Sequence, residues 1–417
     1  MTNENAGIQA FASFLAARRR ARGLTQQGVA DALGVSFQAV SKWESAVSYP
    51  NIELLPTLAG MLGVTVDALL AGQNAPGLTY SQAGVDVNRT DALKAAIAAH
   101  METDDPRVLN GVGPFASLYD IHFPDMAQPV LVLKAEEPGS KQKLAAAYGY
   151  TESVCHDMIN HLVNDIAVMG ARPLAVLDTI ICGGAAQDTL AAIVKGIADA
   201  CRVNGCALVG GETSIQPEVI DKSTFILTAT VAGVVERARI IDGATICEGD
   251  AVLAVASNGL HTNGYSLVRL LMKEATDIWQ TQVNGESFLE AIMKPHTAYR
   301  ACINDLLAHS RVHGMAHITG GGIADNVRRV MPNGLCAQID LSRVRCLPVF
   351  SLIKQRGAID DAEMLRTFNC GVGLVVIVPR DQATATMARM QKYYDCYAIG
   401  EVVRGAERVA FANNICW

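Results

Sequence analysis

The sequence contains no CxxC pair, although it has 11 cysteines among its 417 residues. An odd and scattered set of cysteines is not the pattern of a disulfide framework or of a zinc ribbon. Reduced thiols are therefore expected, which favours a cytoplasmic protein. The chain also lacks any apolar run near the ~18 residues that a membrane span requires, and its start lacks the basic-then-apolar order of a signal peptide. We therefore predict no membrane partner.

An excess of positive charge is absent as well. The formal net charge is −7 and only 18% of the residues are charged, so any nucleic-acid surface must be local. Internal repeats of 20 to 50 residues and low-complexity tracts are also missing. With 50% hydrophobic residues, the chain is long enough to form two or three domains with real cores.

Residues 8–71 are predicted to form four or five short helices. Thr25 is a good N-cap for one helix, Gly34 ends it, and Ser36 caps the next. Phe37, Val40 and Trp43 recur on the apolar side of that second helix and are expected to anchor it. The small, polar "AGQNAPG" that follows has the composition of a linker. We therefore divide the chain into residues 1–72, a linker 73–79, and a body of residues 80–240 and 241–417.

The first of these segments has the spacing of a helix-turn-helix, whose second helix enters the major groove of DNA. A small helical bundle that binds protein is the alternative on helix spacing alone. The stretches "LTQQGVADALGVS", "AVSKWESAVSYPNIELL" and "LGVTVDALL" resemble the phage-repressor-like helix-turn-helix family, which favours double-stranded DNA as the partner. Arg18, Arg19, Arg20 and Arg22 are expected to supply local positive charge. The residues expected to contact DNA are Thr25, Gln26, Ser36, Gln38, Ser41 and Lys42.

The body alternates strand-like apolar runs with helical stretches, which predicts a mixed α/β fold. The runs are 129–134, 173–181, 225–235, 250–257 and 370–379, and the helical stretches include 152–171 and 188–205. Four polar, glycine-rich stretches are expected at strand or helix ends, where glycine lets a backbone approach a ligand. They read "ALVGGETS", "SNGLHTNGYSLVR", "HITGGGIADN" and "RTFNCGVG".

Acidic residues suggest a site for Mg²⁺ and a nucleotide. Glu136 follows an apolar strand, and Asp157 and Asp165 lie eight residues apart on one predicted helix, within one broad face. Asn160, His161 and Asn164 lie between these two aspartates. Each acid alone is more typical of a solvated surface, but with Lys141 and Glu212 they favour a hard cation bound with a nucleotide.

From about residue 79 to 412 the chain resembles the aminoimidazole ribonucleotide synthetase (phosphoribosylformylglycinamidine cyclo-ligase) family. "YSQAGVDVNRTDAL", "VNDIAVMGARPLAVLD" and the four glycine-rich stretches carry this resemblance, in order. It implies a two-domain α/β (α+β) body after an all-α helix-turn-helix domain, and a homodimer formed through the first α/β domain. It also implies ATP-driven ring closure of formylglycinamidine ribonucleotide, with Mg²⁺ as cofactor.

The resemblance implies roles for individual residues. The catalytic set is Lys141, His261, Asn263 and His317. The ATP-binding set is Glu136, Gly139, Ser140, Lys141, Asp157, Asp165, Gly210, Gly211, Glu212 and Thr213. The metal ligands are Glu136, Asp157 and Asp165. The substrate-binding set is Thr319, Gly320, Gly321, Gly322, Arg366 and Asn369.

One loop departs from the family pattern. Where the family has Asp-Gly-Val-Gly-Thr-Lys, this chain reads "EEPGSK" at 136–141, and Pro138 stiffens the loop and removes an amide donor. This departure favours a second hypothesis, a transcription factor whose enzyme-like body only senses a purine intermediate or nucleotide. Retained motif residues such as His261 and His317 favour an active enzyme. A third hypothesis, an ATP-dependent maturation enzyme with a C-terminal thiol, rests only on Cys416, which is not the last residue.

Overall fold

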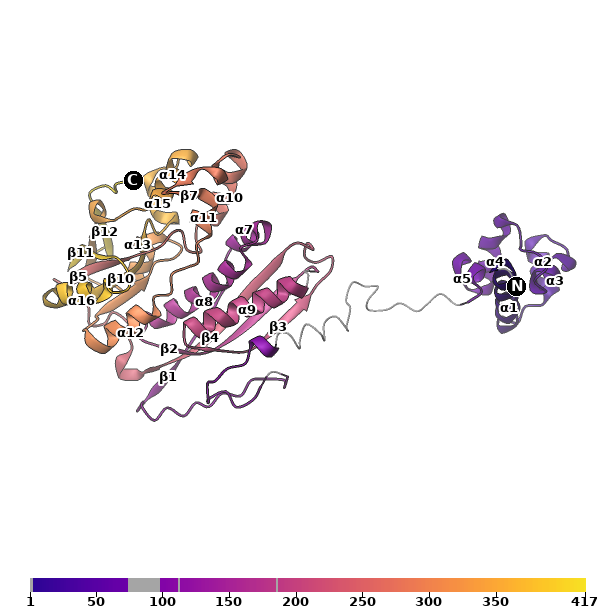
Figure 1. The fold of residues 1–417 in the computed structure, drawn as a ribbon, viewed down its shortest axis with the longest axis horizontal. Coiled ribbons are helices and arrows are strands. Elements are labelled where there is room, and N and C mark those ends of the chain that lie inside the picture. The colour runs from indigo at the N-terminus through magenta and orange to yellow at the C-terminus, as the bar shows by residue number, and fades with distance from the viewer. Residues whose placement is uncertain (1–2, 74–97, 112, 185–186) are drawn as a thin grey trace. The chain divides into compact units, whose positions relative to one another are not determined.

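The computed structural model describes residues 3–73, 98–111, 113–184 and 187–417. The chain divides into two compact units, Met1–Ala83 and Gly84–Trp417 (Figure 1). The predicted linker 73–79 and the motif "YSQAGVDVNRTDAL" lie almost entirely outside the described residues. None of the described helices combines the length and the apolar character needed to cross a bilayer.

The first unit consists of helices, as predicted. Thr25 accepts a hydrogen bond from the Gly28 amide at 3.0 Å, and Ser36 accepts one from the Ala39 amide at 3.2 Å, so both predicted N-caps are present. Gly34 ends its helix with a φ of 64°. The helices are α1 (Asn3–Ala21), α2 (Gln26–Leu33), α3 (Phe37–Glu44), the 3-10 turn η1 (Ile52–Leu54), α4 (Leu55–Leu62) and α5 (Val66–Ala71).

The core of this unit confirms two of the three expected anchors of α3. Val40 and Trp43 are buried beside Phe11, Leu15 and other apolar side chains. The prediction for Phe37 is wrong, because its side chain is 43% exposed. A helical side chain covers the turn that precedes it, and Phe37 is the first residue of α3, with no turn before it to cover.

The second unit begins with a four-stranded sheet in the order β1-β4-β2-β3, in which only β2 and β3 are parallel (Figure 1). Helices α8 (Thr151–Ala167) and α9 (Gln187–Val203) pack against one face, with α7 (Lys141–Tyr148) beside α8. The strand runs predicted at 129–134, 173–181 and 225–235 are confirmed. The strands are β1 (Pro129–Glu136), β2 (Arg172–Cys182), β3 (Ala207–Ile215) and β4 (Phe225–Glu236).

A six-stranded sheet follows, in the order β12-β9-β11-β5-β10-β8. Every residue of β10 is buried, as expected for a strand inside a sheet covered on both faces. The strands are β5 (Ala251–Ala256), β8 (Gly314–His317), β9 (Leu335–Asp340), β10 (Val372–Val378), β11 (Cys396–Arg404) and β12 (Val409–Ala412).

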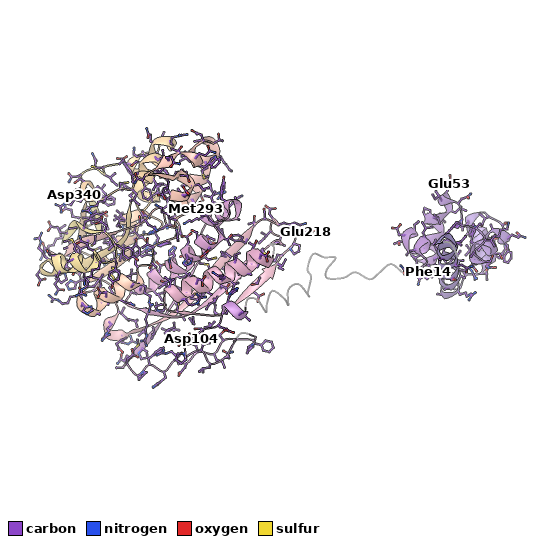
Figure 2. All side chains as sticks on the ribbon, viewed as in Figure 1. Phe14, Glu53, Asp104, Glu218, Met293 and Asp340 are labelled. Atoms are coloured by element: carbon purple, nitrogen blue, oxygen red, sulfur yellow. The ribbon has the colours of Figure 1, made fainter. Side chains whose placement is uncertain are left out.

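Helices and short elements complete this half of the body. Met293, at the end of α11, lies among the side chains of the second unit (Figure 2). The helices are α10 (Tyr265–Glu274), α11 (Phe288–Met293), α12 (Arg300–His309), α13 (Gly322–Val330), α14 (Pro348–Gly357), α15 (Asp361–Thr367) and α16 (Ala383–Met390). The short elements are β6 (Gln282–Val283), β7 (Glu286–Ser287) and the 3-10 turns η2 (Arg237–Arg239), η3 (Ile278–Gln280), η4 (Leu341–Arg343) and η5 (Arg380–Gln382). The all-α unit followed by an α/β body with two sheets confirms the predicted fold class.

Candidate active site

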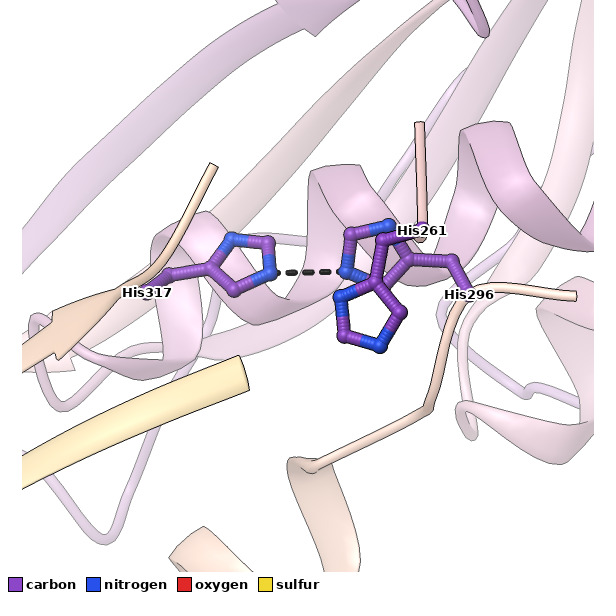
Figure 3. Close-up of side chains that lie close together, drawn as sticks. All are labelled: His261, His296 and His317. Carbon is purple, nitrogen blue, oxygen red and sulfur yellow. Dashed lines mark hydrogen bonds between the residues drawn. The ribbon is translucent and has the colours of Figure 1, made fainter. Parts of the chain in front are cut away.

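Four histidines from separate segments of the second unit gather in one buried place. His161 comes from α8, His261 from the loop before α10, His296 from the loop after α11, and His317 from the end of β8. The rings of His261 and His296 stack with centroids 3.9 Å apart, and His161 lies within 5.3 Å of both His296 and His317. Figure 3 shows His261, His296 and His317 converging. Two of the four were predicted site residues.

A chain of hydrogen bonds runs through this group. Asp165 lies 2.7 Å from His317 Nδ1, and His317 Nε2 lies 2.8 Å from His296 Nε2 (Figure 3). A carboxylate can only accept, so His317 Nδ1 carries a hydrogen. In a neutral His317 the Nε2 atom then accepts from His296 Nε2, which assigns the tautomers of both rings. His296 Nδ1 consequently presents a lone pair.

Among the described residues, that lone pair has no protein partner. The Nδ1 atoms of both His296 and His261 are buried without a hydrogen bond, whereas His261 Nε2 lies 3.2 Å from the Thr297 hydroxyl. Burial lowers the pKa of His261 and of His296 well below the ordinary value, and neighbouring histidines add to the shift. Both rings are therefore neutral near pH 7. Buried polar atoms without partners are rare and mark places of possible chemistry.

Tight packing holds His261 in position. Its φ of 60° lies in the left-handed region. A Cβ at Gly373 would come within 2.8 Å of His261 Cε1 and 1.8 Å of the Tyr299 hydroxyl. Only glycine fits there, which explains the second glycine of "RTFNCGVG". A backbone held outside its common region is a frequent feature of functional sites.

Lys141 and Asp157 form a separate pair with no solvent exposure. Lys141 Nζ lies 2.8 and 2.9 Å from the two carboxylate oxygens, and it donates to the carbonyls of Lys294 at 2.6 Å and His261 at 3.2 Å. Asp157 also accepts from the His296 amide at 2.7 Å. In this structure Lys141 therefore positions the loops that carry His261 and His296.

The expected metal set of Glu136, Asp157 and Asp165 does not assemble as one group. Eight residues of helix span about 12 Å, so Asp157 and Asp165 reach different neighbours on α8. Glu136 and Asp165 do meet, and Lys134 Nζ lies between them at 3.0 and 3.1 Å. His161 Nε2 lies 3.6 Å from Glu136 and 3.7 Å from Asp165.

The Glu136–Asp165 pair fits a divalent cation on the evidence of its geometry. The ammonium of Lys134 already occupies a cation position between two partly exposed carboxylates, and carboxylate oxygens suit Mg²⁺. Burial works against the charge of Asp165, but the hydrogen bond from His317 and the nearby ammonium of Lys134 hold the pKa of this carboxyl well below its usual range. Asp165 is thus ionised at neutral pH.

The glycine turn 319–322 is held by a residue that sequence reasoning passed over. The Asn326 amide donates to the carbonyls of Gly322, Gly320 and Thr319 at 2.8, 3.2 and 3.3 Å, and the Thr319 hydroxyl donates to its oxygen at 3.2 Å. Asn263 Oδ1 lies 3.1 Å from where a Cβ of Gly320 would be. The turn therefore borders the histidine loop 261–263, and its threonine is already engaged.

Other predicted residues lie elsewhere or act on the backbone. Asn369 is buried and donates to the Gly259 carbonyl at 2.9 Å, so it joins two loops of the site. Arg366 is exposed on α15. Gly139 has a φ of 62°, and Ser140 lies 3.4 Å from the Ser266 hydroxyl.

The "GGET" motif was expected at a strand end, and this is wrong, because residues 210–213 lie inside β3. Strand register puts the side chain of Asp178 on the same face of the sheet as that of Glu136. Glu212 pairs with Thr179, and both of these side chains point to the opposite face. The structure therefore does not bring Glu212 to Glu136 and Asp165. A Cβ at Gly211 would meet Asp178 Oδ1 at 1.9 Å, and burial raises the pKa of Asp178 to about 7.

Besides Asn326, sequence reasoning missed His296, Lys134 and Thr297. The signal for His296 and Thr297 was available in "KPHTAY", a polar stretch between two helices. Lys134 lies within an apolar strand, where a single lysine normally faces solvent. No local sequence pattern therefore indicated that it belongs to the site.

The first unit presents a candidate DNA interface on α3. Gln38 and Lys42 are exposed there, and Ser41 is half-buried. Gln26 was expected to contact phosphates, but its amide donates to Glu44 at 2.8 Å, and Arg19 donates to both oxygens of Glu44. Arg18 donates to the Gly63 carbonyl at 3.1 Å. Gln26 and Arg19 thus tie helices together. Because Arg18 and Arg19 bond within the unit, less positive charge is available to DNA than the sequence predicts.

Family comparisons agree with this layout. "AIR synthase related protein, N-terminal domain" matches residues 127–235, its "C-terminal domain" matches 248–412, and "Helix-turn-helix" matches 15–69. The body is thus of the AIR synthase-related class.

The phosphoribosylformylglycinamidine cyclo-ligase of Burkholderia cenocepacia is 41% identical over 79% of this chain and 92% of its own length. That of Methylobacillus flagellatus is 43% identical over 75% and 90%. The chain belongs to the phosphoribosylformylglycinamidine cyclo-ligase family of enzymes.

Solved structures show the same fold at low identity. The hydrogenase maturation protein HypE in complex with ATP has a TM-score of 0.56 and 18% identity, over 77% of this chain and 90% of its own. Thiamine-monophosphate kinase from Stenotrophomonas maltophilia has a TM-score of 0.55 and 18% identity, over 78% and 96%. The likeness to a maturation protein concerns fold alone, while the family identity favours the cyclo-ligase over the maturation enzyme suggested by Cys416.

Proposed function

We propose that this protein closes the imidazole ring of aminoimidazole ribonucleotide from formylglycinamidine ribonucleotide at the expense of ATP. The buried Asp165–His317–His296 chain, ending in an unpartnered nitrogen, is the observation that carries the proposal. In this reaction the amide oxygen is phosphorylated, the neighbouring amine attacks the same carbon, and phosphate leaves. The attacking nitrogen must lose a proton, and neutral imidazoles held in place can accept it.

The charge of the phosphates needs a matching cation. Glu136 and Asp165 would hold Mg²⁺, which when bound neutralises phosphate charge and aligns the phosphoryl group. Lys134 is the side chain that must then move aside, and it remains close enough to contact a phosphate oxygen. Lys141 and Asp157 contribute indirectly, by holding the backbone of His261 and His296. The glycine turn 319–322 supports a close approach of substrate to the backbone.

Incubation with formylglycinamidine ribonucleotide and Mg-ATP, followed by assays for aminoimidazole ribonucleotide and ADP, tests this function. His317→Asn should lower kcat by about 10²- to 10⁴-fold, the usual contribution of general acid–base catalysis. His309→Asn, on an exposed part of α12, is the matched control and should leave the rate unchanged. Equal rates in both variants would remove His317 from the mechanism.

We also propose a homodimer formed through the four-stranded sheet. The face opposite α8 and α9 leaves several large apolar side chains in solvent, and large exposed apolar patches usually mark interfaces. They are Leu131 (58% exposed), Leu133 (64%), Leu177 (48%) and Ile226 (37%). Leu133→Lys should shift a sedimenting dimer to a monomer, while Val203→Lys, at an exposed position ending α9, should not. A wild-type monomer at micromolar concentration would contradict the dimer.

The helix-turn-helix unit is proposed to bind double-stranded DNA and to regulate transcription of purine genes. The exposed polar side chains of α3 support this role, and a dimer would present paired readers to paired half-sites. The sensor hypothesis remains the alternative and predicts nucleotide binding without turnover.

The 11 free thiols support a cytoplasmic location. We place the boundary between the two α/β domains at residues 240 and 241, between the two sheets.

A further inference from the structure

A second cluster of ligating side chains lies away from the histidines described above. Cys247 and Asp250 belong to the segment that connects β4 to β5, and His313 directly precedes β8. Cys247 Sγ lies 3.3 Å from Asp250 Oδ1, and His313 Nδ1 lies 2.8 Å from Asp250 Oδ2. One ligand atom from each residue lies within 4.8 Å of the other two. Sulfur, nitrogen and oxygen thus converge on one point from two distant parts of the sequence.

Neighbouring strands hold these residues firmly. The amide of Gly249 donates to the Val402 carbonyl at 2.8 Å, and the Val402 amide donates to the Asp250 carbonyl at 2.8 Å, so the segment is tied to β11. The His313 amide donates to the Ile377 carbonyl at 2.9 Å, which ties it to β10. Asp250 is 2% exposed, His313 is half-buried and Cys247 is exposed. The cluster is therefore rigid on its inner side and open to solvent at the thiol.

We propose that Cys247, Asp250 and His313 form a site for a transition-metal ion, with Zn²⁺ the best fit. A thiolate, an imidazole and a carboxylate are the three ligand types that zinc takes in proteins. Water can occupy the fourth tetrahedral position on the exposed side. Magnesium and calcium do not fit, because both prefer sets made only of oxygen. On binding, the thiol loses its proton to solvent as the metal–sulfur bond forms.

Local structure accounts for only part of the arrangement. The Cys247 amide donates to Asp250 Oδ2 at 3.0 Å, so the aspartate would close this turn without any metal. The Cys247 thiol donates to Asp250 Oδ1 at 3.3 Å, so the same turn also explains where the sulfur lies. The turn does not explain His313, which comes from a segment 63 residues away and reaches the second oxygen of the same carboxylate at 2.8 Å. Bound metal would bridge the β4–β5 connection and the start of β8.

Zinc titration of the full chain, by calorimetry with Mg²⁺ in large excess, tests the site. We expect one equivalent of Zn²⁺ whose affinity falls at least 10-fold in Cys247→Ser and in His313→Gln. Cys416→Ser is the matched control, since Cys416 is the other exposed thiol, and should bind as the wild type does. Circular dichroism verifies that His313→Gln folds, and Cys247→Ser alters only an exposed atom.

Cobalt substitution supplies a second readout, because a thiolate ligand gives Co²⁺ a near-ultraviolet charge-transfer band. The band should appear in the wild type and in Cys416→Ser and be absent in Cys247→Ser. Binding that is unchanged by Cys247→Ser, lost in Cys416→Ser, or undetectable in the wild type would overturn the proposal. The proposal does not depend on the cyclo-ligase activity.

Discussion

Two polar clusters of the molecule differ in whether their hydrogen-bonding atoms are satisfied. In the first unit, Glu44 accepts from Arg19 and Gln26, and the group joins α1, α2 and α3. In the second unit, His261 and His296 each keep a buried nitrogen without a partner. A satisfied cluster stabilises a fold, whereas an unsatisfied buried atom costs about 1–3 kcal/mol and is retained where chemistry needs it.

The difference assigns distinct tasks to the two regions. In the first unit, the buried charged side chains hold three helices together, and the exposed side of α3 remains available to contact a partner. In the second unit, burial keeps the imidazole rings neutral and holds them in position. Each task can therefore be disturbed without the other.

The largest expected effect is that of deleting residues 1–75. DNA binding should be lost completely, while cyclo-ligase activity should stay within about 2-fold, because each unit has its own core. Electrophoretic mobility shift and product assays on the same preparation measure both. A loss of catalysis together with DNA binding would show that the first unit is part of the active body.

Lys141→Met should lower the free energy of unfolding by about 3–5 kcal/mol, because Asp157 would be left as an unpaired buried charge. Burial already raises the pKa of Asp157 to about 6, partly offset by Lys141. Denaturant titration measures the change. The double variant Lys141→Met with Asp157→Leu should recover only the part of the loss that comes from the unpaired carboxylate, because the backbone partners of both side chains stay unpaired. Equal losses in the single and double variants would contradict a mutual pairing.

The neutral histidines should make stability depend on pH in acid. The pKa values of His261 and His296 are lowered in the folded state, so the unfolded chain binds more protons below pH 6.5 and stability falls as pH falls. Asp178, with a pKa raised to about 7, acts in the opposite direction, so we compare variants at each pH.

Replacing both histidines by asparagine should remove this dependence. From pH 7.5 to 5.5 the double variant should lose about 2–3 kcal/mol less stability than the wild type, roughly 1.4 kcal/mol for each histidine. Parallel pH profiles, measured by urea unfolding, would show that the folded histidines are not held neutral.

The smallest expected effects concern α3. Gln38→Ala should weaken specific DNA binding by about 1–3 kcal/mol and relax preference at one base pair, as loss of an amide contact to a base edge does. Lys42→Ala should weaken binding to all sequences and reduce its salt dependence. Gln26→Ala, whose partner is Glu44, should change binding little; a loss as large as that of Gln38→Ala would return Gln26 to the interface. Fluorescence anisotropy with DNA from upstream of this protein's own gene measures all three.

The helices and strands could be predicted from the sequence because caps and apolar runs act locally. Thr25, Gly34 and Ser36 were each identified from residues within a few positions. The candidate site could be predicted only in part. His261 and His317 lie in distinctive motifs, but the partners that give them chemistry come from distant segments. His296 reaches His317 only after α11 and β8 are in place, and no spacing in the chain encodes that meeting.

The misplaced acids illustrate the same limit. Asp157 and Asp165 share one helix, as expected, yet Asp157 meets Lys141 and Asp165 meets His317. Strand register, which depends on pairing across the sheet, puts Glu212 on the face away from Glu136. Helical periodicity places residues on a face, but tertiary pairing decides which neighbours they find there.

The most direct test of the central claim is the stoichiometry of the purified full-length chain with formylglycinamidine ribonucleotide and Mg-ATP. We predict one aminoimidazole ribonucleotide formed for each ADP released, through many turnovers. Saturable nucleotide binding with neither product nor ADP formed would contradict an active cyclo-ligase and establish the body as a sensor.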